Sequence, residues 1–76
     1  MKKHKYVRKE YGFIIFPDAM QHSDFKKYNG NILSAGFCYI DTEKQVCKCF
    51  GESVSLNIKS LEEDSERMTH QFFNFY

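Results

Sequence analysis

The fold is decided by residues 32–50, which read ILSAGFCYIDTEKQVCKCF. Residues 32–40 are rich in β-branched and aromatic side chains that fall alternately on two faces, as in a β-strand. The polar run DTEK at 41–44 is typical of a turn, and residues 45–50 return with the character of the first segment. This pattern predicts an antiparallel hairpin in the middle of the chain.

Two further strands are predicted outside this hairpin. Residues 11–16, YGFIIF, form a short run stopped by Pro17, with apolar side chains on both faces. We expect an inner strand here that is covered on both sides. In residues 53–58, SVSLNI, apolar and polar side chains alternate strictly, which predicts a strand with one buried and one exposed face.

Two helices are predicted from their capping residues. Asp18 and Gln21 fit the start of a short helix that ends near the Asn-Gly-Asn sequence at 29–31, with Ser23 as an alternative cap. Ser60 and Glu63 form an S-x-x-E capping box for a helix near the C-terminus.

An apolar stripe should dock this second helix on the sheet, and its residues are Leu61, Met68, Phe72 and Phe75. Phe73 and Tyr76 fall off the stripe, so we expect them away from the core side. Glu63 and Arg67 are spaced for an ion pair along the helix.

These elements predict one small α+β domain over residues 1–76, in the order β-α-β-β-β-α. An antiparallel sheet of three to four strands would carry the C-terminal helix on one face. Residues 1–10 are polar and basic, and they form either a basic arm or a ragged first strand. A chain of 76 residues buries only about 60% of its unfolded surface, so a deep enclosed active site would use much of its core.

The composition indicates a folded protein, because 42% of the residues are hydrophobic and 17% are aromatic. Cys38, Cys47 and Cys49 are an odd number of cysteines, which argues against a closed disulfide set and favours reduced thiols in the cytoplasm. The apolar run at 13–16 is too short for a signal peptide, and no stretch approaches the roughly 20 residues of a membrane span.

No motif predicts catalysis, a cofactor or a bound metal. Cys47 and Cys49 would share one strand face, but zinc sites usually take C-x₂₋₄-C pairs, so core cysteines are the simpler interpretation. The sequence GESVS at 51–55 lacks the last glycine of the hydrolase motif G-x-S-x-G. His22 is expected as a polar residue on a helix face. We therefore predict a protein that is not an enzyme and has no cofactor.

The basic segment at the start of the sequence is the most usable functional signal. Its cations are Lys2, Lys3, Lys5, Arg8 and Lys9. Tyr6 and Tyr11 are interleaved with them. Cations contact phosphates and aromatic rings stack on unpaired bases, so the segment is suited to nucleic acid. The net charge of +1 is low for such a protein, which makes nucleic-acid binding the alternative function.

The leading interpretation is a small binding or regulatory module that acts on a protein partner. It rests on the small size, the lack of a catalytic motif, and more aromatic residues than so small a core easily hides. The predicted contact residues are Lys3, Lys5, Tyr6, Arg8, Tyr11, Phe73 and Tyr76. Self-association through an exposed sheet edge is a third possibility.

Two stretches, LSAGF at 33–37 and GESVSL at 51–56, resemble those of short orphan proteins from bacteria and their phages. The resemblance covers the central part of the chain. It implies a compact interaction protein, including an inhibitor of a host or defence complex. Such proteins have no assigned activity to transfer, so the resemblance assigns no functional residue.

Overall fold

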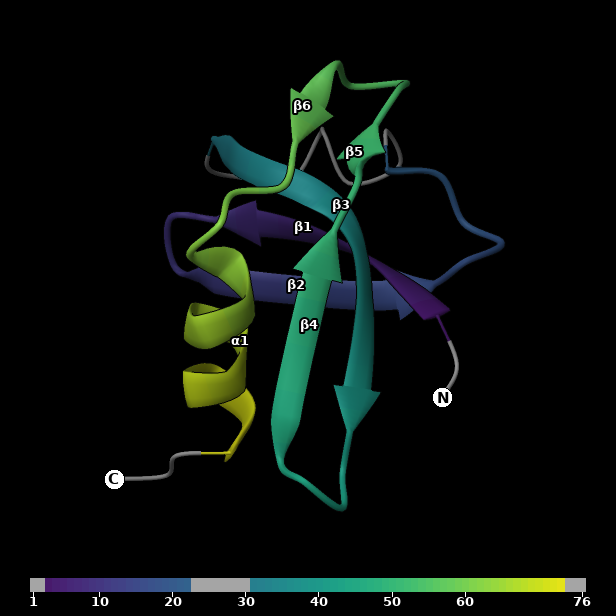
Figure 1. The fold of residues 1–76 in the computed structure, drawn as a ribbon. Coiled ribbons are helices and arrows are strands. Elements are labelled where there is room, and N and C mark those ends of the chain that lie inside the picture. Colours follow the sequence, from purple (N-terminus) through teal and green to yellow (C-terminus); the bar gives the residue numbers. More distant parts are fainter. Residues whose placement is uncertain (1–2, 23–30, 74–76) are drawn as a thin grey trace.

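The computed structural model describes residues 3–22 and 31–73 (Figure 1). It is an α+β fold in which the C-terminal helix packs on a four-stranded antiparallel sheet. The elements are β1 (Lys3–Lys9), β2 (Gly12–Pro17), β3 (Ile32–Asp41), β4 (Val46–Phe50), β5 (Glu52–Ser53), β6 (Ile58–Lys59) and α1 (Asp64–Phe73). β5 and β6 pair with each other as a small second sheet.

β1 lies inside the main sheet, whose strand order is β2-β1-β3-β4. The basic segment 1–10 therefore contains a central strand, in which Tyr6 and Val7 point to opposite faces and are both fully buried. The predicted inner strand at 11–16 is β2, which is an edge strand, so that prediction is wrong in position. The turn between β1 and β2 places β2 beside β1, and β3 takes the other side of β1.

The predicted central hairpin is confirmed as β3 and β4, with Cys38 opposite Cys49. The Asp41 side chain holds the connecting turn, because its Oδ1 accepts hydrogen bonds from the backbone N–H groups of Glu43 and Lys44 at 3.1 Å. β3 curves strongly, pairing with β1 along most of its length and with β4 over its last residues (Figure 1).

The predicted strand at 53–58 is wrong. The segment is a tight hairpin in which residues 54–57 form the turn between β5 and β6. The Ser53 hydroxyl accepts a hydrogen bond from the Leu56 N–H at 3.3 Å, and Asn57 adopts the left-handed conformation. Val54 consequently points outward with 85% of its surface exposed. Alternating apolar residues therefore coincide here with a turn that a serine side chain stabilises.

The C-terminal helix begins at Asp64, later than the capping box at Ser60 predicts. The Ser60 hydroxyl donates instead to the Gly51 carbonyl at 2.8 Å. The Asp64 carboxylate accepts the Leu61 N–H at 2.9 Å. In the predicted capping box, Glu63 would accept the Ser60 N–H, so the same hydrogen bond is formed one residue later in the chain. The predicted ion pair between Glu63 and Arg67 is present.

The apolar stripe of α1 is confirmed at Met68, which is fully buried, and at Phe72, which packs against the core. Leu61, before the helix, is 42% exposed. Phe73 also packs against the core, so its expected position away from the core side is wrong. Phe75 and Tyr76 lie outside the described residues.

The helix predicted at Asp18 does not begin there. A turn follows β2, closed by a 3.0 Å hydrogen bond from the Met20 N–H to the Pro17 carbonyl. The remainder of that prediction, residues 23–30, lies outside the described part of the chain.

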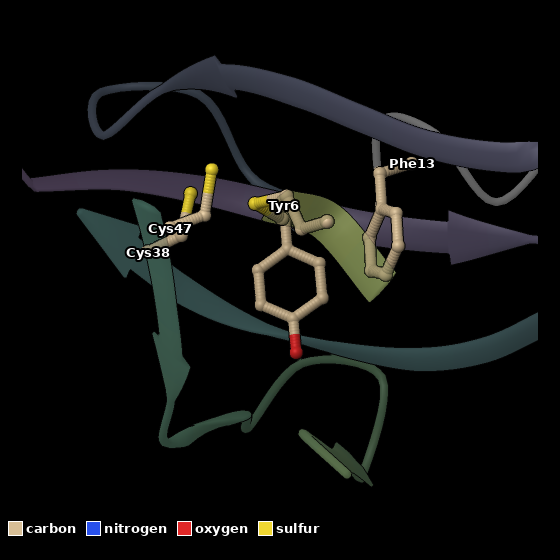
Figure 2. Packing of buried hydrophobic residues seen from close by; sticks show 5 residues of the cluster. Tyr6, Phe13, Cys38 and Cys47 are labelled. Carbon is tan, nitrogen blue, oxygen red and sulfur yellow. The ribbon is translucent and has the colours of Figure 1, made fainter. Parts of the chain in front are cut away.

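The sheet has a core on each face. Between the sheet and α1 lie Tyr6, Phe13, Cys38, Cys47 and Met68. Figure 2 shows Tyr6 between Phe13 on one side and the two cysteines on the other. On the opposite face, Val7, Phe16 and Ala35 are covered by Leu56 and Ile58 of the β5–β6 hairpin. Toward β4 on this face, Phe50 is 38% exposed and Lys48 is also exposed, so this end of the face reaches solvent.

Side chains of α1 bond to both edge strands of the sheet. Thr69 Oγ1 and Ser65 Oγ each accept a 2.8 Å hydrogen bond, from the N–H groups of Cys47 and Cys49 on β4. Gln71 Oε1 accepts the N–H of Phe13 on β2 at 3.0 Å. These hydrogen bonds occupy backbone N–H groups of the two edge strands, which a second chain would need for edge-to-edge pairing.

Candidate nucleic-acid interface

Three aromatic side chains form a row on the accessible face of the sheet. Phe37 and Tyr39 of β3 point to the same face because they are two residues apart, and Phe50 of β4 is paired with Phe37. The Phe50 ring is stacked on both, with ring centroids 5.9 Å from Phe37 and 5.3 Å from Tyr39. Phe50 is 38% exposed and the other two are half-buried, so this aromatic row reaches solvent.

Three lysines share the face of the aromatic row. Lys3 and Lys48 are both paired with Tyr39, from β1 and β4 respectively, and Lys5 is paired with Phe37. Paired residues of neighbouring antiparallel strands point to one face. The Lys3 ammonium lies 4.6 Å from the centroid of the Phe37 ring. We call these six residues, Phe37, Tyr39, Phe50, Lys3, Lys5 and Lys48, the aromatic–lysine face.

A pocket of about 420 Å³ opens beside Phe37. Its lining also includes Lys5, His22, Glu52 and Val54. Phe37 belongs to both the pocket and the aromatic row, so the two surfaces are continuous. The pocket lies where the β5–β6 hairpin meets the main sheet.

His22 has a 3₁₀-helical backbone, and its side chain is buried in this pocket. Its Nε2 lies 2.8 Å from the Gly36 carbonyl oxygen, which can only accept, so Nε2 carries the hydrogen. The ring meets Phe16 and Phe37 edge to face. Burial lowers the pKa of His22, which favours the neutral ring.

The predicted contact residues divide between the two faces of the sheet. Lys3 and Lys5 lie on the aromatic–lysine face, whereas Tyr6 and Arg8 lie on the face that α1 covers. Tyr6 is fully buried, so it cannot touch a partner in this conformation. Its hydroxyl donates to Asp64 Oδ2 at 2.6 Å, and Arg8 pairs with Asp64 Oδ1 at 3.1 Å.

The remaining predicted contacts do not gather at one place. Tyr11 is 69% exposed in the turn between β1 and β2. It lines a cleft of about 1070 Å³ that runs between this turn, β4 and α1, where Arg8 and Glu63 form an ion pair at 3.3 Å. Phe73 is half-buried against the core, and Tyr76 lies outside the described residues.

The three cysteines are free thiols on the face that α1 covers. Burial raises the pKa of Cys38 and of Cys49 to about 12, and it also raises the pKa of Cys47. They are therefore protonated and weakly nucleophilic at neutral pH. Across residues 3–22 and 31–73, no three Cys, His, Asp or Glu side chains are grouped so as to hold a metal ion.

The predicted contact residues did not include Phe37, Tyr39, Phe50 and Lys48, which are four of the six residues of the aromatic–lysine face. A signal was present: aromatic residues alternate at 37 and 39, and a lysine and a phenylalanine alternate at 48 and 50. Placing these positions side by side required the register of β3 and β4.

Within the described part of the chain, no helix has the length and apolar character needed to cross a bilayer. Comparison with protein-family models, with curated proteins and with solved structures finds no match for this chain.

Proposed function

We propose that this protein binds single-stranded nucleic acid through the aromatic–lysine face. The observation that carries the proposal is the stacked row of Phe37, Tyr39 and Phe50 on an accessible sheet face that also bears three lysines. Unpaired bases expose their rings and can stack on aromatic side chains, while lysines contact the phosphates between them. A duplex hides its base faces, so the single strand is the better fit.

Stacking should supply most of the affinity. Each base stacked on an aromatic side chain contributes about 1–3 kcal/mol. The electrostatic contribution is smaller, because the chain carries a net charge of +1 and the face presents three lysines. Three phosphate contacts would give a slope of about −2 for the logarithm of the binding constant against the logarithm of salt concentration.

Fluorescence anisotropy with labelled oligothymidylate and oligouridylate tests this proposal. We expect Phe50→Ala to weaken binding roughly tenfold or more, because one stacking platform is lost. The matched control is Tyr11→Ala, an exposed aromatic residue outside the face, which should bind as the wild type does. Lys48→Ala should weaken binding and flatten the salt dependence, whereas Lys44→Ala, in the β3–β4 turn, should do neither. Equal binding by Phe50→Ala and wild type would overturn the proposal.

A non-enzymatic module that acts on a protein partner, such as an inhibitor of a host or defence complex, stays a second proposal. Its support is the exposed Tyr11 at the rim of the cleft beside α1. Affinity purification with and without nuclease separates the two functions. A protein partner that survives nuclease, and is lost with Tyr11→Ala but kept with Phe50→Ala, supports this second function.

We place either activity in the cytoplasm. All three cysteines are free, and cytoplasmic thiol systems keep cysteines reduced. Their raised pKa values further slow oxidation, because the thiolate is the reactive form.

A further inference from the structure

We infer that the pocket beside Phe37 receives one base of the bound strand and prefers guanine. This inference rests on the proposed binding of single-stranded nucleic acid. It adds a base preference to a surface whose stacking contacts alone accept any base.

The pocket is continuous with the aromatic row. Phe37 lines the pocket and also belongs to the aromatic row, so a strand stacked along the row passes the pocket mouth. The pocket measures about 420 Å³, and Val54 and Ser55 of the β5–β6 turn belong to its lining. Phe37 and Val54 contribute apolar surface to its lining, against which a flat ring can pack.

The described lining of the pocket carries a pair of opposite charges, on Glu52 and Lys5. The Glu52 carboxylate can only accept hydrogen bonds, and the Lys5 ammonium can only donate them. Lys5 Nζ donates to the Met20 carbonyl at 2.8 Å, which uses one of its three hydrogens and holds the group at the pocket. Within residues 3–22 and 31–73, the Glu52 carboxylate takes part in no ion pair.

Guanine matches this charge pair better than the other bases do. Its N1–H and N2–H₂ donors are adjacent on one edge and suit the two oxygens of a carboxylate, while its O6 and N7 acceptors suit a lysine. Thymine and uracil place carbonyl oxygens on both sides of their single N–H, which a carboxylate repels. Adenine and cytosine offer only one donor group, the exocyclic amine, on the edge that would face Glu52.

Contacts of His22 hold one wall of the pocket in place. His22 is clamped between Phe16 and Phe37, and its Nε2–H donates to the Gly36 carbonyl at 2.8 Å. Because burial lowers the pKa of His22, the wall adds no positive charge that would compete with Lys5 at neutral pH. Glu52 and Lys5 are then the charged groups that a base meets among the described lining residues.

The test compares oligothymidylate with the same strand carrying one central guanine, adenine, cytosine or hypoxanthine. Using anisotropy titrations, we expect guanine alone to raise the affinity by on the order of tenfold. Hypoxanthine lacks the N2 amine and should recover only part of this gain. Glu52→Gln keeps the size of the side chain but replaces one acceptor oxygen by a donor, so it should abolish the preference for guanine.

Glu43→Gln, in the exposed β3–β4 turn, is the matched control and should keep the preference. Equal affinity for all central bases, a preference for another base, or a guanine preference that survives Glu52→Gln would overturn this inference while the proposed function stands. If no oligonucleotide binds the wild type, the proposed function fails, and the base preference fails with it. Thermal melts of each variant confirm that any lost binding is not lost folding.

Discussion

The Tyr6 hydroxyl donates a 2.6 Å hydrogen bond to Asp64 Oδ2, and this bond ties the central strand to the start of the helix 58 residues later. Both side chains are fully buried. Asp64 also accepts the Leu61 N–H, which fixes the loop before α1. Its ion pair with Arg8 of β1 joins the start of α1 to the sheet. The buried acid is thereby supplied with the partners that burial of a charge requires.

Tyr6→Phe should therefore destabilise the protein without changing its shape. The substitution removes a buried hydrogen bond to a carboxylate, which typically stabilises by about 1.5–3 kcal/mol. Urea unfolding measures the effect. Tyr39→Phe is the matched control, because the Tyr39 ring lies on the accessible face. A Tyr6→Phe protein as stable as Tyr39→Phe would mean that this bond contributes nothing to the fold.

Thr69→Val should leave the backbone N–H of Cys47, on the edge strand β4, without its hydrogen-bond acceptor. Valine has the shape of threonine but cannot accept the Cys47 N–H, which Thr69 Oγ1 accepts at 2.8 Å. An N–H left without a partner costs about 1–3 kcal/mol where water does not replace the bond. Hydrogen exchange should show faster exchange of the Cys47 amide, and urea unfolding a lower stability. Thr42→Val, in the exposed turn, serves as control. Unchanged exchange at Cys47 would contradict the role assigned to Thr69.

Stability should fall between about pH 7.5 and pH 5.5 because of His22. Burial lowers its pKa in the folded state below the usual value of about 6.5, so the unfolded chain binds more protons over this range. The contribution of His22 is fully present above the unfolded pKa and is lost as the pH falls, by at most about 1.4 kcal/mol per pH unit.

Urea unfolding at several pH values measures this dependence. His22→Gln should flatten it, because the glutamine side chain does not titrate. His70→Gln, at an exposed position on α1, should keep it. A pH dependence that is the same in His22→Gln and wild type would show that His22 is not the titrating group.

The sequence was a good guide to elements whose signal is local. The hairpin of β3 and β4 follows from alternating side chains around a polar turn, and the docked face of α1 follows from the spacing of Met68 and Phe72. Residues 53–58 show the limit of that reasoning, because a turn stabilised by Ser53 and a strand can carry the same alternation of apolar residues.

By itself, the sequence determined the class of the fold, the central hairpin and the presence of a C-terminal helix, since hydrophobic periodicity acts over a few residues. Only the tertiary structure decided that the basic N-terminal segment is an inner strand. Pairing across β1 and β3 depends on register between distant residues, and that register places Lys3 beside Tyr39 on one face. It also sends Tyr6 to the opposite face, into the core. The aromatic–lysine face exists because of this long-range pairing, which a single sequence does not encode in any local pattern.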